Sequence, residues 1–346
     1  MGTRVLVTGA TGFVAGWVIS ELLEHGYAVR ATVRDLAAPD KRAHLAARGG
    51  ELEFVAADLE RDAGWAEAVS GCAAVLHVAS PFPATPPADE RELIGPAVEG
   101  TLRVLRAAAA AGTVRRVVLT SSIAAIAHGH ARHDVIRTEA DWSVVAESAA
   151  YQKSKTLAER AAWDFVAAEQ PFELVAVNPG MVLGPLQSAT ATSTSHEPVR
   201  RLLAGAVPGA PRVGWATVDV RDLAVLHRLA LEQPAAAGNR YIAAGEHVWM
   251  RELGDILAAE FASRGYRVPT RTLPDLLVRA VALFDKGVRL TVPTLGVAER
   301  LSADKARREL GWTMRPVRDS VLDTAASLIE HGIVHRPRRA AQPAEV

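Results

Sequence analysis

Tyr151 and Lys155 stand four residues apart in a stretch with a helical pattern, and this spacing is the first feature of the sequence that predicts chemistry. On a helix the two side chains lie on one face, one turn from each other. A tyrosine hydroxyl with a pKa near ~10 is a poor acid at neutral pH, but a neighbouring ammonium favours the phenolate and lowers that pKa. The pair therefore predicts proton transfer at Tyr151, assisted by Lys155. Lys153 points to another side of the helix and is not expected to take part.

A hydroxyl-bearing turn, Thr120-Ser121-Ser122, follows an apolar run that predicts a buried strand. In a parallel sheet such a turn lies at the carboxyl edge, where α/β proteins build their sites. The hydroxyl of Ser122 could donate to a carbonyl oxygen while Tyr151 delivers a proton, and a positioned acid contributes roughly 10²–10⁴ in rate. No histidine or acidic residue stands in a nucleophile-elbow setting, so the sequence does not favour hydrolysis at Ser122.

The first apolar run is followed by the glycine-rich segment TGATGFVAG and then by a helical pattern. A helix that begins after such a turn presents free N–H groups and the positive end of its dipole to a phosphate. Gly9 permits the tight turn, Gly12 lets a phosphate approach the backbone, and Ala15 is small enough to pack the helix on the strand. The spacing is Gly-x-x-Gly-x-x-Ala rather than Gly-x-Gly-x-x-Gly. Its place at the first strand–helix junction predicts a dinucleotide site.

The end of the second predicted strand indicates which dinucleotide would bind. An acidic residue there favours a ribose 2′-hydroxyl, whereas an arginine accommodates a 2′-phosphate. Arg34 comes first in this sequence and can stack on adenine while it pairs with the phosphate. Asp35 follows and should point away, and Lys41 could add a second positive charge. The pattern favours NADP(H) over NAD(H).

Short apolar runs alternate with helical patterns through the first half of the chain. This alternation predicts an α/β fold with a Rossmann-type, doubly wound parallel sheet, and the near-continuous apolar runs agree with burial on both faces. The predicted strands are Arg4–Val7, Ala28–Val33, Leu52–Ala56, Ala74–Val78, Val114–Thr120 and Leu174–Val177. Helices are predicted at about Gly12–His25, Lys41–Arg48, Gly64–Val69 and Asp89–Ala111, with another from near Tyr151.

The pattern changes after Pro185, which predicts a large domain and a smaller C-terminal lobe. Residues 1–185 form the predicted NADP-binding domain, to which 215–245 return. The predicted substrate-binding lobe comprises 186–214 and 246–334, and 335–346 are a flexible tail. Gln187–Pro198 is rich in Ser, Thr and Ala without a hydrophobic period, which predicts a mobile loop or lid. Helices of the lobe are predicted at about Met250–Arg264, Ser302–Leu310 and Pro316–His331.

Composition and charge are those of an ordinary globular protein. The 346 residues carry 39 basic and 39 acidic side chains, a net charge of zero that favours neither nucleic acid nor an acidic membrane as partner. The sequence has neither signal-peptide features nor a run of about 18 apolar residues, so a cytoplasmic protein without a membrane partner is predicted. Cys72 is the only cysteine, which rules out an intrachain disulfide.

The segment HGHARH contains three closely spaced histidines, a residue type that often binds metals: His128, His130 and His133. They follow the Ser122 strand in a loop, and no second cluster of ligands is evident that would complete a tetrahedral site. We therefore predict no metal site.

Seven motifs occur in order along the chain: VTGATGFVAGW, ATVRD, AADL, LHVASPF, TSSIAAI, YQKSKTLAERAAW and NPGMVLGP. Through them the sequence resembles the extended short-chain dehydrogenases/reductases, most closely the dihydroflavonol 4-reductase-like branch, which also holds aldehyde and ketone reductases. The resemblance covers nearly the whole chain and is strongest over residues 3–185.

The resemblance implies roles for individual residues. Tyr151 would be the acid/base, Lys155 would lower its pKa and bind ribose, and Ser122 would hold the substrate oxygen. Phe82 and Ala127 would border the substrate, and Ala127 stands where plant flavonoid reductases carry an asparagine. The family's cofactor contacts would fall on Arg34 at the 2′-phosphate, Asp58 and Leu59 at adenine, Val78, Ala79 and Ser80 on the adenosine side, and Pro179, Gly180, Met181 and Val182 at the nicotinamide. The predicted cofactor site further includes Gly9, Thr11, Gly12, Phe13 and Val14 at the glycine turn, Lys41, Thr120, Tyr151 and Lys155.

The function these observations favour is NADPH-dependent, reversible reduction of an aldehyde or ketone by a monomer or homodimer. Two alternatives stay open. One is a nucleotide-sugar epimerase or dehydratase, or a hydroxysteroid dehydrogenase, although Arg34 argues against the sugar enzymes, which usually carry an acidic residue at that point. The other is a non-catalytic dinucleotide sensor, although such sensors generally lose the Tyr-x-x-x-Lys pair that is intact here.

Overall fold

A sheet of seven parallel strands forms the centre of the computed structural model, which describes residues 2–80, 89–289 and 291–335. The strands are β1 (Arg4–Val7), β2 (Ala28–Val33), β3 (Leu52–Ala56), β4 (Ala74–His77), β5 (Arg116–Thr120), β6 (Glu173–Pro179) and β9 (Arg240–Ala243). Their order is β3-β2-β1-β4-β5-β6-β9, with every neighbouring pair parallel. The order therefore reverses between β1 and β4, and ligands of such sheets bind at that crevice.

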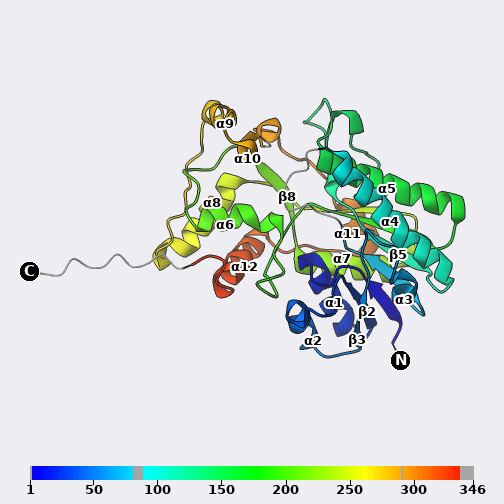
Figure 1. Cartoon of the computed structure of the whole chain (residues 1–346). Coiled ribbons are helices and arrows are strands. Elements are labelled where there is room, and N and C mark those ends of the chain that lie inside the picture. The colour runs from blue at the N-terminus through cyan, green and yellow to red at the C-terminus, as the bar shows by residue number, and fades with distance from the viewer. Residues whose placement is uncertain (1, 81–88, 290, 336–346) are drawn as a thin grey trace, which may run out of the picture.

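Helices cover both faces of the sheet, as Figure 1 shows. Val5 and Val7 of β1 face α1 (Phe13–Glu24) and α7 (Val220–Glu232), whereas Leu6 faces the side of α3 (Trp65–Val69), α4 (Arg91–Ala111) and α5 (Ala150–Glu169). Strands buried on two faces need apolar residues at consecutive positions, which is why the runs are nearly continuous. The predicted doubly wound, Rossmann-type fold is confirmed.

A second, smaller sheet begins directly after β6. It has the order β10-β8-β7, from β7 (Met181–Leu183), β8 (Gly214–Asp219) and β10 (His247–Trp249). A separate apolar cluster joins this sheet to its helices, which gather on the left in Figure 1. They are α6 (Glu197–Leu203), α8 (Met250–Phe261), α9 (Asp275–Val281), α10 (Lys286–Arg289) and α12 (Val317–Glu330). The limits predicted for the domain and the lobe stay a prediction.

Short elements complete the described chain. The helix α2 (Ala43–Ala46) follows β2, and α11 (Asp304–Leu310) packs back on α7 and β9. Seven single turns of 3₁₀ helix are η1 (Pro39–Arg42), η2 (Ile123–Ala125), η3 (Val145–Glu147), η4 (Thr194–His196), η5 (Pro234–Ala236), η6 (Ala262–Arg264) and η7 (Val292–Thr294). Within the described residues, no helix is both long and apolar enough to cross a membrane.

The prediction of a loop over Gln187–Pro198 is wrong at its C-terminal end. The 3₁₀ turn η4 occupies Thr194–His196, and α6 begins at Glu197. Ser193 caps the turn by accepting a hydrogen bond of 3.3 Å from the N–H of Ser195. The segment has no hydrophobic period because its C-terminal part is rich in Ser and Thr, and one of these residues, Ser193, caps the turn that leads into α6.

Candidate active site

The glycine turn between β1 and α1 has the shape that a phosphate needs. Gly9 adopts a φ of +77°, and a Cβ atom there would lie 3.0 Å from the Cβ of Ala79. Among the described side chains none caps α1, and its first turn contains no acidic residue. The free N–H groups and the dipole of α1 therefore fit a pyrophosphate. This turn contains the predicted contacts Gly9, Thr11, Gly12, Phe13 and Val14.

Hydrogen bonds of 2.9 Å hold the ends of β1, β2 and β4 together around the turn. The N–H of Gly9 donates to Thr32 Oγ1, and Thr8 Oγ1 contacts His77 Nδ1 and accepts from the N–H of Ala79. Burial lowers the pKa of His77 to about 3, so its ring is neutral near pH 7. Val78, Ala79 and Ser80, which are predicted to contact the adenosine, follow directly after the end of β4.

At the end of β2, Arg34 and Asp35 differ in what they contact. Arg34 is exposed, and its side chain makes no hydrogen bond or ion pair with another described residue. Asp35 instead turns back into its own loop, where its Oδ1 accepts from the N–H of Ala37 at 2.7 Å. The side chain of Lys41 lies outside the described part of the chain. Asp58 and Leu59 follow β3 at the same edge of the sheet.

Ser122 and Tyr151 are brought together from two distant parts of the sequence. Ser122 follows β5 and begins η2, where its Oγ accepts from the N–H of Ala124 at 3.1 Å and lies 3.5 Å from the carbonyl of Pro179. Burial raises the pKa of Tyr151, at the start of α5, and a side-chain hydrogen bond with Ser122 opposes that shift. The two side chains thus lie close enough to interact at the carboxyl edge of the sheet, next to Thr120, the last residue of β5.

Lys155 lies one turn further along α5 and reaches the end of β4. Its Nζ donates to Ser80 Oγ at 2.9 Å, and burial lowers the pKa of its ammonium to about 8. Lys153 points elsewhere and pairs with Glu90 at 2.8 Å, as expected from the helical period.

Backbone contacts of Gly180 hold the segment that follows β6. The N–H of Gly180 donates to the carbonyl of Ala243 at 3.0 Å, and a Cβ at Gly180 would lie 2.1 Å from the carbonyl oxygen of Ala216. Only glycine permits this approach of two strands. The predicted nicotinamide contacts Pro179, Gly180, Met181 and Val182 form this passage from β6 to β7.

On the predicted substrate side, Ala127 follows η2 and is partly buried, whereas Phe82 lies outside the described residues. In the HGHARH segment, His128 Nε2 lies 3.7 Å from Glu299 Oε1 and His130 Nε2 contacts the carbonyl of Ile126 at 2.8 Å. No group of three metal-ligating side chains gathers among the residues that the structure describes.

Sequence reasoning missed two buried side chains at this edge. The ring of His196 packs edge-on against Phe13 of the glycine turn at 4.3 Å between centroids, and its Nε2 is buried without a partner among the described residues. Glu159 lies one turn after Lys155 and pairs with Arg240 at 2.6 Å. The sequence shows that Glu159 follows Lys155 by four residues, one helical turn. It does not show that Glu159 pairs with Arg240, because the two residues stand 81 positions apart.

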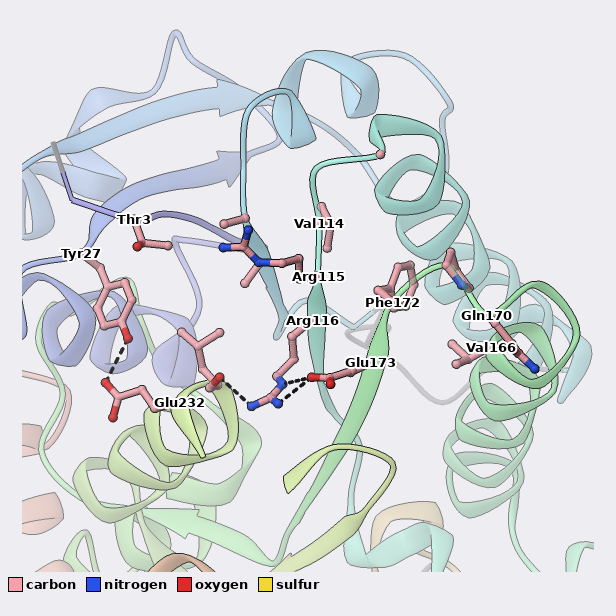
Figure 2. A pocket seen from close by; sticks show the side chains of 15 residues that line it. Thr3, Tyr27, Val114, Arg115, Arg116, Val166, Gln170, Phe172, Glu173 and Glu232 are labelled. Atoms are coloured by element: carbon pink, nitrogen blue, oxygen red, sulfur yellow. Dashed lines mark hydrogen bonds and ion pairs between the residues drawn. The ribbon is translucent and has the colours of Figure 1, made fainter. Parts of the chain in front are cut away.

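A depression of about 800 Å³ lies at the opposite, amino edge of the sheet and contains none of the predicted site residues. Figure 2 shows its polar lining, in which Arg116 pairs with Glu173 at 2.6 Å and Tyr27 donates to Glu232 at 3.0 Å. Sites of doubly wound sheets lie at the carboxyl ends of the strands. The predicted residues Ser80, Thr120 and Lys155 instead line a smaller cavity of about 20 Å³ at the carboxyl edge.

Comparisons with known proteins agree with this geometry. Residues 5–245 match the model of the NAD dependent epimerase/dehydratase family. A cinnamoyl-CoA reductase of Medicago truncatula is 40% identical over 247 residues, which cover 69% of this chain and 75% of the relative. A ketoreductase of Aspergillus niger is 32% identical and covers 95% and 98% of the two chains. The crystal structure of the yeast methylglyoxal/isovaleraldehyde reductase Gre2, complexed with NADPH, superposes with a TM-score of 0.80 at 26% identity, covering 96% of this chain and all of that one.

Proposed function

The chain belongs to the NAD dependent epimerase/dehydratase family, the extended short-chain dehydrogenases/reductases, and from that premise we propose that it reduces an aldehyde or ketone to an alcohol with NADPH. The observation that carries the proposal is the meeting of Ser122, Tyr151 and Lys155 at the sheet edge where the glycine turn would hold a pyrophosphate. The reaction is reversible, so the same site would oxidise the alcohol.

The three side chains have different tasks in this reaction. Ser122 donates a hydrogen bond to the carbonyl oxygen of the substrate, and Tyr151 gives that oxygen its proton. Lys155 lowers the pKa of the Tyr151 hydroxyl through its positive charge and holds the ribose next to the nicotinamide. The nicotinamide, when bound, supplies the hydride to the carbonyl carbon. Pro179, Gly180, Met181 and Val182 form the wall on which that ring would rest.

The preference for NADPH rests on the contrast between Arg34 and Asp35. The guanidinium of Arg34 is exposed and makes no hydrogen bond or ion pair with other described residues, so it can pair with a 2′-phosphate. The carboxylate of Asp35 is turned into its own loop, away from a ribose 2′-hydroxyl. The neighbouring Gre2 structure holds NADPH, which supports the same choice.

The proposed substrate class is broad. Relatives are named for cinnamoyl-CoA and for ketones, and a neighbour is named for methylglyoxal and isovaleraldehyde. Ala127 offers no polar group where flavonoid reductases carry an asparagine, so a flavonoid is not the expected substrate. We propose a small aldehyde or ketone.

The test is consumption of NADPH and of NADH over a panel of aliphatic aldehydes, aryl ketones and keto esters. Turnover of at least one carbonyl with NADPH, and much slower turnover with NADH, is the expected result. A purified protein that carries stoichiometric NAD would favour a sugar epimerase or dehydratase instead. Tight NADPH binding with no turnover across the panel would favour a dinucleotide sensor.

A further inference from the structure

We propose that Glu159 is a positioning residue of this site, which holds the Ser122 turn in place through a buried network of hydrogen bonds and lines the same small cavity as the ammonium of Lys155, which its charge stabilises. The inference rests on the proposed function for its kinetic consequences, but the arrangement itself is a property of the cofactor-free protein. The side chain of Glu159 is 0% exposed, and its ion-pair partner Arg240 is 9% exposed.

Glu159 is surrounded by donors from four elements. Its Oε1 accepts from Arg240 Nε on β9 at 2.6 Å and from Trp163 Nε1 on α5 at 3.3 Å. Its Oε2 accepts from Ser121 Oγ at 2.5 Å and from Asn178 Nδ2 on β6 at 2.7 Å. Every partner of the carboxylate donates, which is the environment a buried negative charge requires.

The network reaches Ser122 through its main chain. Asn178 Nδ2, which donates to Glu159, also donates to the carbonyl oxygen of Ser122 at 3.1 Å. Ser121, the preceding residue, is tied to the same carboxylate. Glu159 therefore fixes the backbone on both sides of the Ser121–Ser122 peptide, and with it the direction of the Ser122 hydroxyl.

Arg240 extends the network to the loop before α5. Its Nη1 donates to the carbonyls of Glu139 and Asp141 at 2.9 and 2.7 Å, and its guanidinium lies 3.8 Å from the ring centre of Trp142. Arg240 therefore joins β9 and this loop to Glu159. The carboxylate is held by a residue that lies outside α5, the helix that carries Lys155.

Lys155 is coupled to Glu159 by charge. The two side chains line one small cavity of about 20 Å³, together with His77, Ser80 and Thr120. Burial lowers the pKa of Lys155, and the charge of Glu159 opposes that shift. Without the carboxylate, the ammonium would lose its proton at a lower pH.

Other titratable groups around the pair do not account for this effect. His77 on β4 is neutral above its pKa of about 3, and Tyr151 is a neutral phenol whose pKa burial raises. The positive charge of Arg240 on β9 would oppose the ammonium rather than stabilise it. From α4 the cavity is lined by Ala97 and Thr101, and from β5 by Leu119 and hydroxyl side chains, none of which carries a charge.

The first experiment measures the pKa of Lys155 by competitive labelling of lysine amines across a range of pH, with mass spectrometry of the cofactor-free protein. Glu159→Gln should lower the labelling midpoint of Lys155 by about one pH unit or more, since a nearby opposite charge shifts a pKa by that amount. The remote Lys305 should not change. An unchanged midpoint for Lys155 would overturn the proposed charge coupling, whatever the protein reduces.

The matched control is Glu173→Gln. Glu173 also pairs with an arginine, Arg116, but at the opposite edge of the sheet shown in Figure 2. This variant should leave the Lys155 midpoint where it is. If Glu159→Gln proves too unstable to purify, Glu159→Gln/Arg240→Gln leaves no unpaired buried charge and is measured instead. The midpoint should fall there too, because Glu159 is the charge that supports the ammonium.

The second experiment separates positioning from charge with Glu159→Asp, which keeps the carboxylate and shortens its reach. We expect kcat to fall at least tenfold because the Ser121 and Asn178 contacts are lost, while the alkaline limb of the pH profile stays at its wild-type position. In Glu159→Gln that limb should move to lower pH. A Glu159→Asp variant with wild-type kcat would overturn the role at Ser122.

Discussion

The ammonium of Lys155 donates a hydrogen bond of 2.9 Å to the hydroxyl of Ser80, which joins the predicted ribose-binding lysine of α5 to the loop after β4. The two residues stand 75 positions apart in the sequence and meet at the carboxyl edge of the sheet. The bond thereby ties α5 to the loop after β4, and the position of the Lys155 ammonium is set before any ligand arrives. This preorganisation makes the charge state of Lys155 decisive for the site.

The pH dependence of carbonyl reduction should follow that charge state. Burial lowers the pKa of Lys155 to about 8, so the ammonium is present below that pH and is lost as the pH rises through it. We expect kcat for reduction to fall on the alkaline side with a midpoint near this value, because a neutral amine no longer lowers the pKa of Tyr151. A stopped-flow or steady-state profile from pH 6 to 10 measures it. A rate that stays flat to pH 10 would contradict the role given to Lys155.

Replacement of Tyr151 by phenylalanine removes the proposed proton donor and leaves the ring in place. We expect Tyr151→Phe to lower kcat/KM by roughly 10²–10⁴ while NADPH affinity changes little, since the hydroxyl acts in the chemical step. Tyr27→Phe removes a hydroxyl at the opposite sheet edge, where it binds Glu232, and serves as the control. Equal turnover by the two variants would exclude Tyr151 as the acid.

Most strands of the main sheet could be predicted because their signal is local, whereas β9 is expected only as part of the returning segment 215–245. β1, β2 and β3 begin and end at the predicted residues, and β4 and β5 differ from prediction by one or two residues at one end. The central strands β1, β4 and β5 are buried along nearly their whole length, so an apolar run marks their limits, whereas the edge strand β3 is only partly buried and includes Glu53. The glycine turn and the Tyr151–Lys155 pair are local as well.

Features that depend on distant partners could not be predicted in this way. The strand β8 pairs with β7 and β10 in a second sheet, and nothing within its own six residues shows which sheet it joins. The buried contact of Glu159 with Arg240 needs the path of β9 beside β6. The helix α9 exposes Leu276 and Leu277 to solvent, so it lacks the one-sided pattern by which an amphipathic helix is found.

Selectivity for the dinucleotide should depend on Arg34. We expect Arg34→Ala to raise the KM for NADPH by about 10- to 100-fold, the equivalent of one or two charge-assisted hydrogen bonds to phosphate, and to leave the KM for NADH nearly unchanged. Arg251→Ala, which removes an exposed arginine from α8, is the control for a general loss of positive charge. Parallel losses with both cofactors would show that Arg34 does not read the 2′-phosphate.

Stability should depend strongly on Trp312, which locks the segment after α11 against α7. Its side chain is 1% exposed, and its Nε1 donates to the carbonyl of Asp222 at 2.7 Å. Trp312→Ala removes a large buried ring and leaves that carbonyl without its donor, so we expect a loss of about 3–5 kcal/mol in the free energy of unfolding. Phe284→Ala removes an aromatic ring that is 91% exposed and should change the free energy of unfolding by less than about 0.5 kcal/mol. Urea denaturation of both variants measures the difference, and similar midpoints would mean that the Trp312 contact contributes little to the fold.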